Sequence, residues 1–298
     1  MANNIPTPFL KWAGGKGRLL PVLKKNYPVE LGEKINKYIE PFVGSGAVLF
    51  DILSTYDIKE VYINDINNEL INAYNVIKYD VESLIKLLSK IQEEYLILDL
   101  ENRKKYFYKK RDLFNNHITE NILNTETAAL FIYLNKTCFN GLYRVNSKGL
   151  YNVPTGNYKN PTICNSENLR AVSKKLSTVN LKCGDYKNLE DIIDNNTFIY
   201  FDPPYRPLNK TSSFNTYTKI AFDDDSQIEL ANFIKRISNK GARILASNSD
   251  PKNTDPDDNF FDDLYSDMNI KRVSIKRLIN MDASKRNNEI TEILIKNY

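Results

Sequence analysis

Residues 39–49 read IEPFVGSGAVL, and this stretch decides the fold class. Its apolar start, the glycines Gly44 and Gly46, and its apolar end predict a strand, a tight glycine turn and the start of a helix. In doubly wound α/β folds this arrangement brings a nucleoside cofactor against bare backbone. The third glycine of the dinucleotide fingerprint is absent, because Leu49 occupies its place. We therefore expect a cofactor without a pyrophosphate.

A second strand is predicted at residues 59–64, and a carboxylate follows it. Asp65 comes nineteen residues after Gly46, close to the spacing at which an acidic residue holds the ribose hydroxyls of a bound nucleoside. A glycine turn, an acid for the ribose and the lack of phosphate chemistry together predict S-adenosylmethionine as the cofactor.

An apolar run at residues 197–201 is followed by Asp202, Pro203, Pro204 and Tyr205. In open α/β sheets ligands bind beyond the carboxyl ends of the strands, so these side chains are expected to project into a site. Asp202 and the Pro203 carbonyl suit the hydrogens of an exocyclic amino group, and Tyr205 offers a face on which a purine or pyrimidine can stack. From these residues alone, an ordinary strand-to-turn junction is an equally good interpretation.

The composition is that of a globular protein. A chain of 298 residues with 42% hydrophobic residues can form one large α/β domain with a smaller inserted one. The longest apolar stretch, residues 128–134, is far shorter than the roughly 20 residues that span a membrane, and the polar start lacks a signal-peptide core. The three cysteines have no Cys-x-x-Cys spacing and predict neither a disulfide framework nor a zinc site, so we expect a protein of the reducing cytoplasm. The single histidine, His117, is expected in a solvated loop.

Positive charge is concentrated in one segment. Residues 101–160 hold ten Lys or Arg against four Asp or Glu, a surplus of six, whereas the net charge of the whole chain is +4. Aromatic residues are interleaved with the charges between residues 103 and 111, as expected of a face that binds phosphates and also packs on its own domain. A solvated amphipathic helix is the alternative interpretation.

The remaining pattern predicts a split α/β domain. Ser226 and Glu229 have the spacing of a capping box, which predicts the start of a helix after Tyr205. Residues 250–263 are acidic and interrupted by proline, and we expect a mobile surface loop there rather than a metal site. Strands are expected at residues 35–43, 59–64, 179–183, 197–201, 241–247, 270–277 and 290–296, the last two as a hairpin, and helices within 81–100 and 125–134.

Several separated motifs, taken together, resemble the DNA adenine N6-methyltransferases of the Dam type, which include modification enzymes that recognise GATC. The motifs follow the family's order nearly from end to end. They are an amino-terminal cofactor motif at residues 9–16, the glycine motif at 41–46, a DNA-reading hairpin at 140–146 and 151–159, the catalytic motif at 202–205 and the closing strand at 291–298.

This resemblance implies an α/β, Rossmann-like fold of the S-adenosylmethionine-dependent methyltransferases, with a mixed, mostly parallel seven-stranded sheet. It also implies an inserted, mainly helical target-recognition domain that carries a β-hairpin. We expect a discontinuous catalytic domain at residues 1–71 and 177–298, and the target-recognition domain at residues 72–176.

The amine chemistry explains the catalytic motif. The lone pair of the adenine amino group is delocalised into the ring, so the enzyme must polarise it. Asp202 and the Pro203 carbonyl, accepting both amino hydrogens, would localise the lone pair toward the sulfonium methyl, and direct in-line transfer needs reacting atoms about 3–3.5 Å apart. The base must leave the duplex, with Tyr205 as its stacking partner and Phe139 as a wedge in the vacated stack. The predicted catalytic set is Asp202, Pro203, Pro204 and Tyr205.

The resemblance assigns further residues to the cofactor, and their chemistry agrees. The Lys16 ammonium suits the methionine carboxylate, and the Trp12 ring attracts a cation. Asp185 and Tyr186 resemble the pair that holds the cofactor adenine; a loop acid beside a half-buried tyrosine is the alternative. The full predicted cofactor set is Trp12, Lys16, Phe42, Gly44, Gly46, Asp65, Asp185, Tyr186 and Asp202, without a metal ion.

The resemblance also assigns DNA contacts. Arg144 and Lys11 match the two acceptors of guanine, and Leu142 and Pro154 match the thymine methyl group. Arg111 is expected to contact a phosphate. The resemblance makes GATC the expected site. The full predicted DNA-binding set is Lys11, Arg111, Phe139, Asn140, Leu142, Arg144, Asn146, Asn152, Pro154, Tyr158 and Lys159.

Other activities fit the sequence less well. Cytosine N4 methylation uses the same amine chemistry, but a serine in place of Asp202 is its usual mark. Cytosine C5 methylation needs a cysteine nucleophile, generally after a proline, and no Pro-Cys pair occurs. A DNA-binding regulator with an inactive site is opposed by the intact motifs, and a nucleotidase by the lack of a P-loop pattern at residues 13–18. The expected partners are double-stranded DNA and, in the same system, a companion restriction endonuclease that is not a stable subunit.

Overall fold

The computed structural model describes residues 5–12, 14–207, 222–276 and 289–298. Its centre is a seven-stranded sheet in the order β3-β2-β1-β4-β5-β7-β6. Strands β1 to β5 pair in parallel, and β7 lies antiparallel between β5 and β6. This mixed, mostly parallel sheet confirms the predicted fold class. The strands are β1 (Lys37–Glu40), β2 (Glu60–Asp65), β3 (Val179–Cys183), β4 (Thr197–Phe201), β5 (Arg243–Ser249), β6 (Asn269–Lys276) and β7 (Glu289–Lys296).

The central strands are recognisable in the sequence because both of their faces are covered. Every residue of β4 is buried, and a parallel strand covered on both faces reads as a continuous apolar run. Strands β3 and β4 begin and end at the predicted residues. Strand β1 is shorter than the strand expected at residues 35–43, because Ile35 pairs only in an isolated bridge with Leu31 and Pro41 has no N–H for the ladder.

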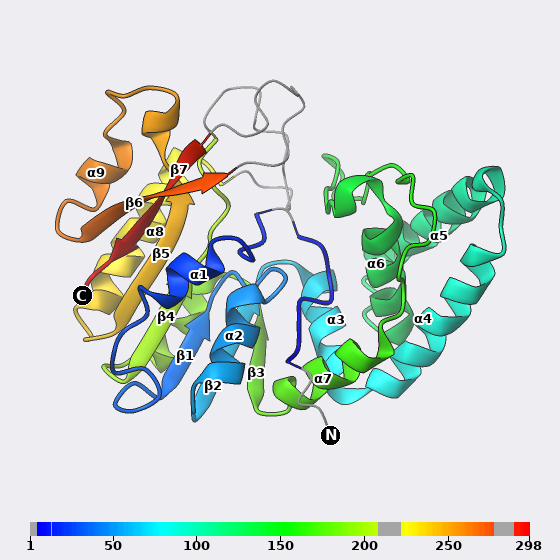
Figure 1. Cartoon of the computed structure of the whole chain (residues 1–298), viewed down its shortest axis with the longest axis horizontal. Coiled ribbons are helices and arrows are strands. Elements are labelled where there is room, and N and C mark those ends of the chain that lie inside the picture. The colour runs from blue at the N-terminus through cyan, green and yellow to red at the C-terminus, as the bar shows by residue number, and fades with distance from the viewer. Residues whose placement is uncertain (1–4, 13, 208–221, 277–288) are drawn as a thin grey trace.

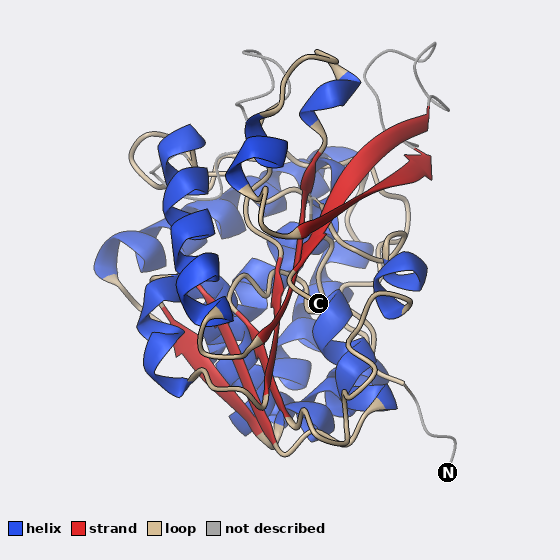
Figure 2. Cartoon of the chain, turned by 90° about the vertical axis from the view of Figure 1, so that its left-hand side faces the viewer, coloured by secondary structure: helices blue, strands red, loops and turns tan. Residues whose placement is uncertain are grey.

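Helices lie on both sides of the strands (Figure 2), and α4, α5 and α6 gather on the far side of α3 from the sheet (Figure 1). Helix α3 packs on β2 and β3 and also on α4, α6 and α7. The expected domain boundary after residue 71 therefore falls inside α3, and the division into two domains stays a prediction. Within the described ranges, no helix is long and apolar enough to cross a membrane. The helices are α1 (Leu20–Lys24), α2 (Ala47–Thr55), α3 (Asn68–Tyr79), α4 (Val81–Leu96), α5 (Leu100–Glu120), α6 (Thr125–Thr137), α7 (Ser166–Leu176), α8 (Asp224–Ser238) and α9 (Phe260–Leu264), with short 3-10 turns η1 (Phe139–Gly141), η2 (Tyr186–Ile192) and η3 (Pro251–Asn253).

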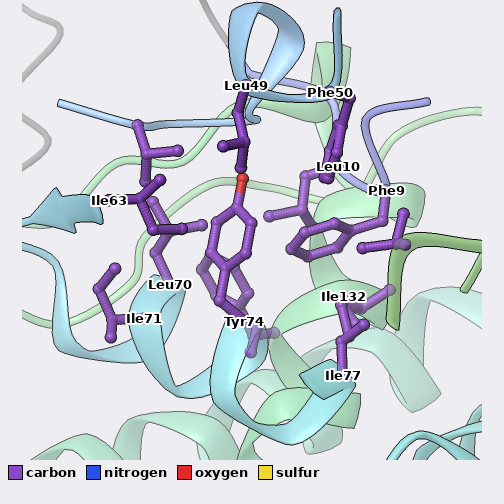
Figure 3. Packing of buried hydrophobic residues seen from close by; sticks show 14 of the residues in the cluster. Phe9, Leu10, Leu49, Phe50, Ile63, Leu70, Ile71, Tyr74, Ile77 and Ile132 are labelled. Carbon is purple, nitrogen blue, oxygen red and sulfur yellow. The ribbon is translucent and has the colours of Figure 1, made fainter. Parts of the chain in front are cut away.

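One cluster of buried apolar residues continues from the sheet into the helices. Figure 3 shows Phe9 and Leu10 beside Phe50 of α2, Tyr74 of α3 and Ile132 of α6. The rings of Phe9 and Tyr74 meet edge to face, with centroids 5.0 Å apart. The amino-terminal segment is thus held between the sheet and the helices by apolar packing.

The helical pattern expected at residues 81–100 forms two elements. Helix α4 ends at Leu96, and α5 begins at Leu100. The Asp99 side chain accepts a hydrogen bond from the Asn102 N–H at 2.8 Å, as an N-cap residue does. The cap at Asp99 is the local signal that separates the two helices.

The start of α8 differs from the expected capping box. The cap is Asp223, whose carboxylate accepts from the Ser226 N–H at 3.0 Å, and the helix begins at Asp224. Glu229 does not reach back to the cap and instead pairs with Lys187 at 2.8 Å. The expected role of Ser226 as the cap was therefore wrong, because an acid three residues earlier occupies that position.

Two polar groups expected at the surface are buried. His117 is not in a loop: it lies on α5 with 7% of its surface exposed, and its Nδ1 is 2.8 Å from the Thr127 hydroxyl oxygen. Asp250 is 1% exposed, pairs with Arg272 at 3.1 Å and accepts from the Thr291 hydroxyl at 2.7 Å. The segment at residues 250–263 is consequently not a simple surface loop.

Residues 138–159, here called the 138–159 loop, carry the expected hairpin only as two isolated bridges, one of them between Val145 and Tyr151. The side chain of Asn115 on α5 donates to the Tyr151 carbonyl and accepts from its N–H, at 3.1 and 2.8 Å. The Asn146 side chain accepts from two N–H groups of the turn. Side-chain hydrogen bonds therefore replace much of the ladder.

Gly46 marks the point where the turn after β1 enters α2. Its φ of +74° and ψ of +25° are left-handed values that glycine adopts readily. A Cβ at this position would lie 2.6 Å from the Tyr74 hydroxyl oxygen and 3.1 Å from Phe50. Tyr74 is fixed there, because its hydroxyl donates to the Gly44 carbonyl at 3.0 Å. The turn thus needs a residue without a side chain.

We predict that Gly46→Ala lowers the free energy of unfolding by at least about 1–2 kcal/mol, the usual cost of a left-handed non-glycine residue, with the clash in addition. Thermal and denaturant unfolding measure the loss. Gly17→Ala is the matched control, since a Cβ there would meet nothing within 4 Å, and a change within about 0.5 kcal/mol is expected. Equal stability of the two variants would contradict the prediction.

Candidate active site

The carboxyl ends of three neighbouring strands meet at one edge of the sheet. Strand β1 pairs in parallel with β2 on one side and with β4 on the other. Glu40, Asp65 and Asp202 end or follow these strands, so parallel pairing brings three carboxylates to the same edge. This is the edge at which open α/β sheets bind their ligands.

Asp202 is held by a cation and a hydroxyl group. Its Oδ1 lies 2.6 Å from Lys16 Nζ and accepts from the Ser247 hydroxyl at 3.2 Å. Lys16 also donates to the Gly14 carbonyl at 2.7 Å, and its ammonium lies 4.6 Å from the centre of the Tyr205 ring. Among the described residues, no donor contacts Asp202 Oδ2. One oxygen of the carboxylate is thus fixed, and the other remains available to a ligand.

Two opposing effects set the pKa of Asp202. Burial raises the pKa of Asp202, and the nearby Lys16 ammonium lowers it. Burial also raises the pKa of Glu40 well above its usual range, while the Tyr38 hydroxyl donates to this carboxyl at 2.8 Å. Lys16 is the main group that favours the charged form of Asp202, and the Ser247 hydroxyl acts in the same direction.

The remaining residues of the catalytic motif have separate partners. The Tyr205 hydroxyl donates to Glu292 on β7 at 2.7 Å, which leaves the ring face beside Lys16. The Pro204 carbonyl accepts from Gln227 at 3.0 Å. In the part of the chain that the structure describes, nothing donates to the Pro203 carbonyl. Asp202 Oδ2 and the Pro203 carbonyl are thus two acceptors with unused capacity next to an aromatic face.

The glycine turn lies directly against Trp12 and Asp65. A Cβ on Gly44 would be 2.9 Å from the Trp12 ring. Asp65 accepts from the Gly44 N–H at 3.2 Å and from the Asn67 N–H at 3.0 Å, and burial raises its pKa to about 6. Trp12 in turn stacks on Tyr143, with centroids 5.8 Å apart. A fixed carboxylate beside bare backbone fits the nucleoside end of S-adenosylmethionine.

A second aromatic surface follows β1 and β3. The rings of Phe42 and Tyr186 are 5.4 Å apart and inclined by 39°. Asp185 accepts from the Lys187 N–H at 2.8 Å, which fixes its carboxylate at the start of η2. The structure thus places Phe42 beside the predicted adenine-binding pair.

The predicted DNA-binding residues come together through Asn135 on α6. This buried side chain accepts from the Lys11 N–H at 2.9 Å and donates to the carbonyls of Lys11 and Gly141 at 2.8 and 3.0 Å. The Lys11 ammonium lies 4.3 Å from the Tyr158 ring centre. The amino-terminal motif and the 138–159 loop, far apart in the sequence, therefore share one surface.

The other members of the set lie along this loop or on α5. Phe139 is 52% exposed. Asn140 is left-handed, with φ of +56°. Arg144 donates to Asn152 at 2.8 Å. Arg111, on α5, packs over the Tyr108 ring at 4.6 Å. Leu142 and Asn146 are partly buried, whereas Pro154 and Lys159 are exposed.

The sequence did not single out five residues that organise these sites: Ser247, Glu292, Asn135, Asn115 and Arg103. Arg103 donates to the carbonyls of Tyr95 and Leu96 at the end of α4, and to those of Tyr158 and Lys159 at the end of the loop. The run Ser247-Asn248-Ser249-Asp250 at the end of a predicted strand was a usable signal for Ser247. The other four residues act through contacts that no local pattern reveals.

The cysteines and the acidic residues supply no metal centre in the described part of the chain, where no group of three or more potential ligands occurs. Cys138, Cys164 and Cys183 are all free thiols. A cavity of about 370 Å³ lies beside Trp12, Gly15 and Ser45. Neither Asp65 nor Asp202 lines it, so we assign it no part in the chemistry.

The chain is similar to known DNA methyltransferases over nearly all of its length. The family model of the D12 class N6 adenine-specific DNA methyltransferases matches residues 12–279. The type II methyltransferase M.MjaIII of Methanocaldococcus jannaschii is 51% identical over 98% of this chain and 99% of its own length. The type II methyltransferase M1.LlaDCHI of Lactococcus lactis subsp. cremoris is 37% identical over 98% and 95%, and the DNA adenine methylase of Haemophilus influenzae is 37% identical over 94% and 90%. Methyltransferases of this family use S-adenosylmethionine as the methyl donor. Because the family model covers residues 12–279 and these relatives match nearly the whole chain, the chain belongs to the D12 class of N6 adenine-specific DNA methyltransferases.

Proposed function

We propose that this methyltransferase acts on the adenine of GATC in double-stranded DNA, with Asp202, Pro203 and Tyr205 receiving the extruded base. The observation that carries the proposal is the pair of acceptors, Asp202 Oδ2 and the Pro203 carbonyl, to which no described residue donates, beside the Tyr205 ring. An amino group presents two hydrogens, and a purine presents a flat face. The chemistry of these three residues therefore suits an aminated base outside the duplex.

In this proposal, the residues act by polarising and orienting the amino group. Asp202 and the Pro203 carbonyl accept hydrogen bonds from its two N–H groups and direct the nitrogen lone pair away from the ring. The nitrogen gains the methyl group and loses one proton to water. Tyr205, fixed by Glu292, holds the base plane. S-adenosylmethionine, when bound, supplies an electrophilic methyl group. Its proposed binding residues are Trp12, Lys16, Phe42, Gly44, Gly46, Asp65, Asp185 and Tyr186.

The position of Lys16 next to Asp202 suggests a second role for this residue, besides binding the cofactor. The sequence led us to expect Lys16 at the methionine carboxylate, and its ammonium lies on Asp202 at 2.6 Å. We propose that its main task is to keep the partly buried Asp202 ionised, because a charged group that loses water needs a partner. The contact with the methionine carboxylate stays a prediction.

Recognition of GATC is proposed from the composite surface formed by Lys11 and the 138–159 loop. Lys11 and Arg144 supply cationic donors for guanine, and Leu142 and Pro154 supply apolar contacts for thymine. The names of the relatives M.MjaIII and M1.LlaDCHI as type II methyltransferases support a further proposal, that this chain protects DNA against a companion restriction endonuclease that is not a stable subunit.

The sequence preference is tested with a GATC duplex and its single-base-pair variants. Each mismatch with the reading surface is expected to cost about 1–3 kcal/mol, or roughly 5- to 150-fold in rate. Mass spectrometry of the digested product should show N6-methyladenine. Similar methylation of every variant would refute GATC recognition and leave the adenine chemistry unaffected.

The catalytic role is tested with Asp202→Ala. We expect methyl transfer to fall at least about 10²-fold, as it does when a positioned polarising group is removed. Affinity for cofactor and DNA should stay within about tenfold, because the contact acts chiefly in the transition state. Single-turnover transfer of labelled methyl measures the rate. A rate above about a tenth of that of the unmodified enzyme would exclude this role.

The role of Lys16 is tested through the pH dependence of the rate. The ionised Asp202 carboxylate is a stronger hydrogen-bond acceptor for the amine than the protonated acid, so the rate rises as pH increases through its pKa. Burial raises this pKa and Lys16 lowers it. Lys16→Met should therefore move the acidic limb of the single-turnover rate to higher pH at saturating cofactor. Lys90→Met, which removes an exposed charge on α4, should leave the limb in place. A uniform loss at all pH values in Lys16→Met would contradict the assignment.

A further inference from the structure

We propose that Asn152 is a specificity-determining positioning residue, which holds the Arg144 guanidinium so that only its Nη1–Nη2 edge is offered to a base. The inference rests on the proposed reading of guanine by Arg144. It changes the expected role of Asn152, from a direct DNA contact to the support of a neighbouring reader.

The contact is specific for one nitrogen of the guanidinium. Arg144 Nε donates to Asn152 Oδ1 at 2.8 Å. In the described ranges, Arg144 makes no other side-chain hydrogen bond and no ion pair. Among the described residues, its two Nη groups therefore keep their hydrogens for an external acceptor, and no carboxylate pairs with the guanidinium.

The backbone fixes these two residues opposite each other. The Asn152 N–H donates to the Arg144 carbonyl at 3.1 Å. Their neighbours Tyr143, Val145, Tyr151 and Val153 are all buried, whereas Arg144 and Asn152 are only partly buried. Alternation along an extended chain then places the two side chains on the face away from the core.

The limb that carries Asn152 is anchored to α5. The Asn115 side chain makes hydrogen bonds with both the N–H and the carbonyl of Tyr151. The Tyr151 ring is buried against Phe114 and Tyr143, at centroid distances of 6.0 and 5.6 Å. Asn152 therefore stands next to a fixed residue and offers Arg144 a stationary acceptor.

The geometry of guanidinium explains the consequence. An arginine can approach a pair of acceptors with its Nε–Nη edge or with its Nη1–Nη2 edge. Guanine offers O6 and N7 side by side in the major groove. With Nε bound to Asn152, the Nη1–Nη2 edge alone can bind both acceptors. Because the side chain is oriented before DNA arrives, less ordering is needed on binding.

The test compares four variants on the GATC duplex and on duplexes with each base pair changed in turn: Asn152→Ala, Asn152→Asp, Arg144→Ala and the double variant Asn152→Ala/Arg144→Ala. The measured quantity is discrimination, the ratio of kcat/KM on GATC to that on each changed duplex. Asn152→Ala should reduce discrimination about tenfold at the same base pair as Arg144→Ala. Asn152→Asp, which keeps the acceptor, should retain the discrimination even where the added charge lowers the overall rate.

The double variant separates positioning from direct contact. If Asn152 acts through Arg144, removing both costs no more discrimination than Arg144→Ala alone. Equal slowing of Asn152→Ala on every duplex, or additive losses in the double variant, would overturn the inference while the proposed role of Arg144 stands. If Arg144→Ala itself left discrimination intact at every base pair, the proposed reading by Arg144 would fail, and the inference with it.

Discussion

The partly buried carboxylate of Asp202 is the constraint on which the site depends. A charge in this position needs a cation and hydrogen-bond donors to offset the loss of water. Lys16 and Ser247 supply them, and they come from the amino-terminal segment and from β5. The site is therefore complete only when the amino-terminal segment is packed in place. The buried side chains of Phe9 and Leu10 hold this segment in the apolar core.

The positive charge near the proposed DNA-reading surface is held in a different way. Arg103 donates to four backbone carbonyls, and these bonds link the end of α4 to the end of the loop. Arg111 lies over an aromatic ring and has Asp112 at 3.8 Å from its Nε. Among the described residues, the charge of Arg103 is thus not offset by an acid, which suits the proposed binding of DNA beside α5.

Local pattern predicted much of the fold and the positions of some residues of the candidate site, whose roles stay predictions. Strands β3 and β4 were found because apolar runs end at turn signals, and the carboxylates Asp65 and Asp202 follow from the strand ends. Contacts between distant segments were not predictable in this way. Asn115 pairs with the backbone of Tyr151, which no ladder pattern reveals, and the same holds for Asn135 between Lys11 and Gly141. His117 was misplaced because its neighbours in sequence are polar, although its face of α5 packs on α6.

Asn135 also bears on the exchange of specificity between enzymes. Its amide makes hydrogen bonds with the backbone of Lys11 and of Gly141. The proposed reading surface is therefore built from two separate segments of the chain and is not one independent loop. A Cβ on Gly141 would lie 2.5 Å from Lys11, which shows how closely the two segments are fitted. A 138–159 loop transplanted from a relative would carry the side chains proposed to contact bases. It would not carry the amino-terminal segment around Lys11, whose contacts with the loop fix the position of those side chains. Swapping target sites in this architecture calls for moving the two segments and their shared asparagine as one unit.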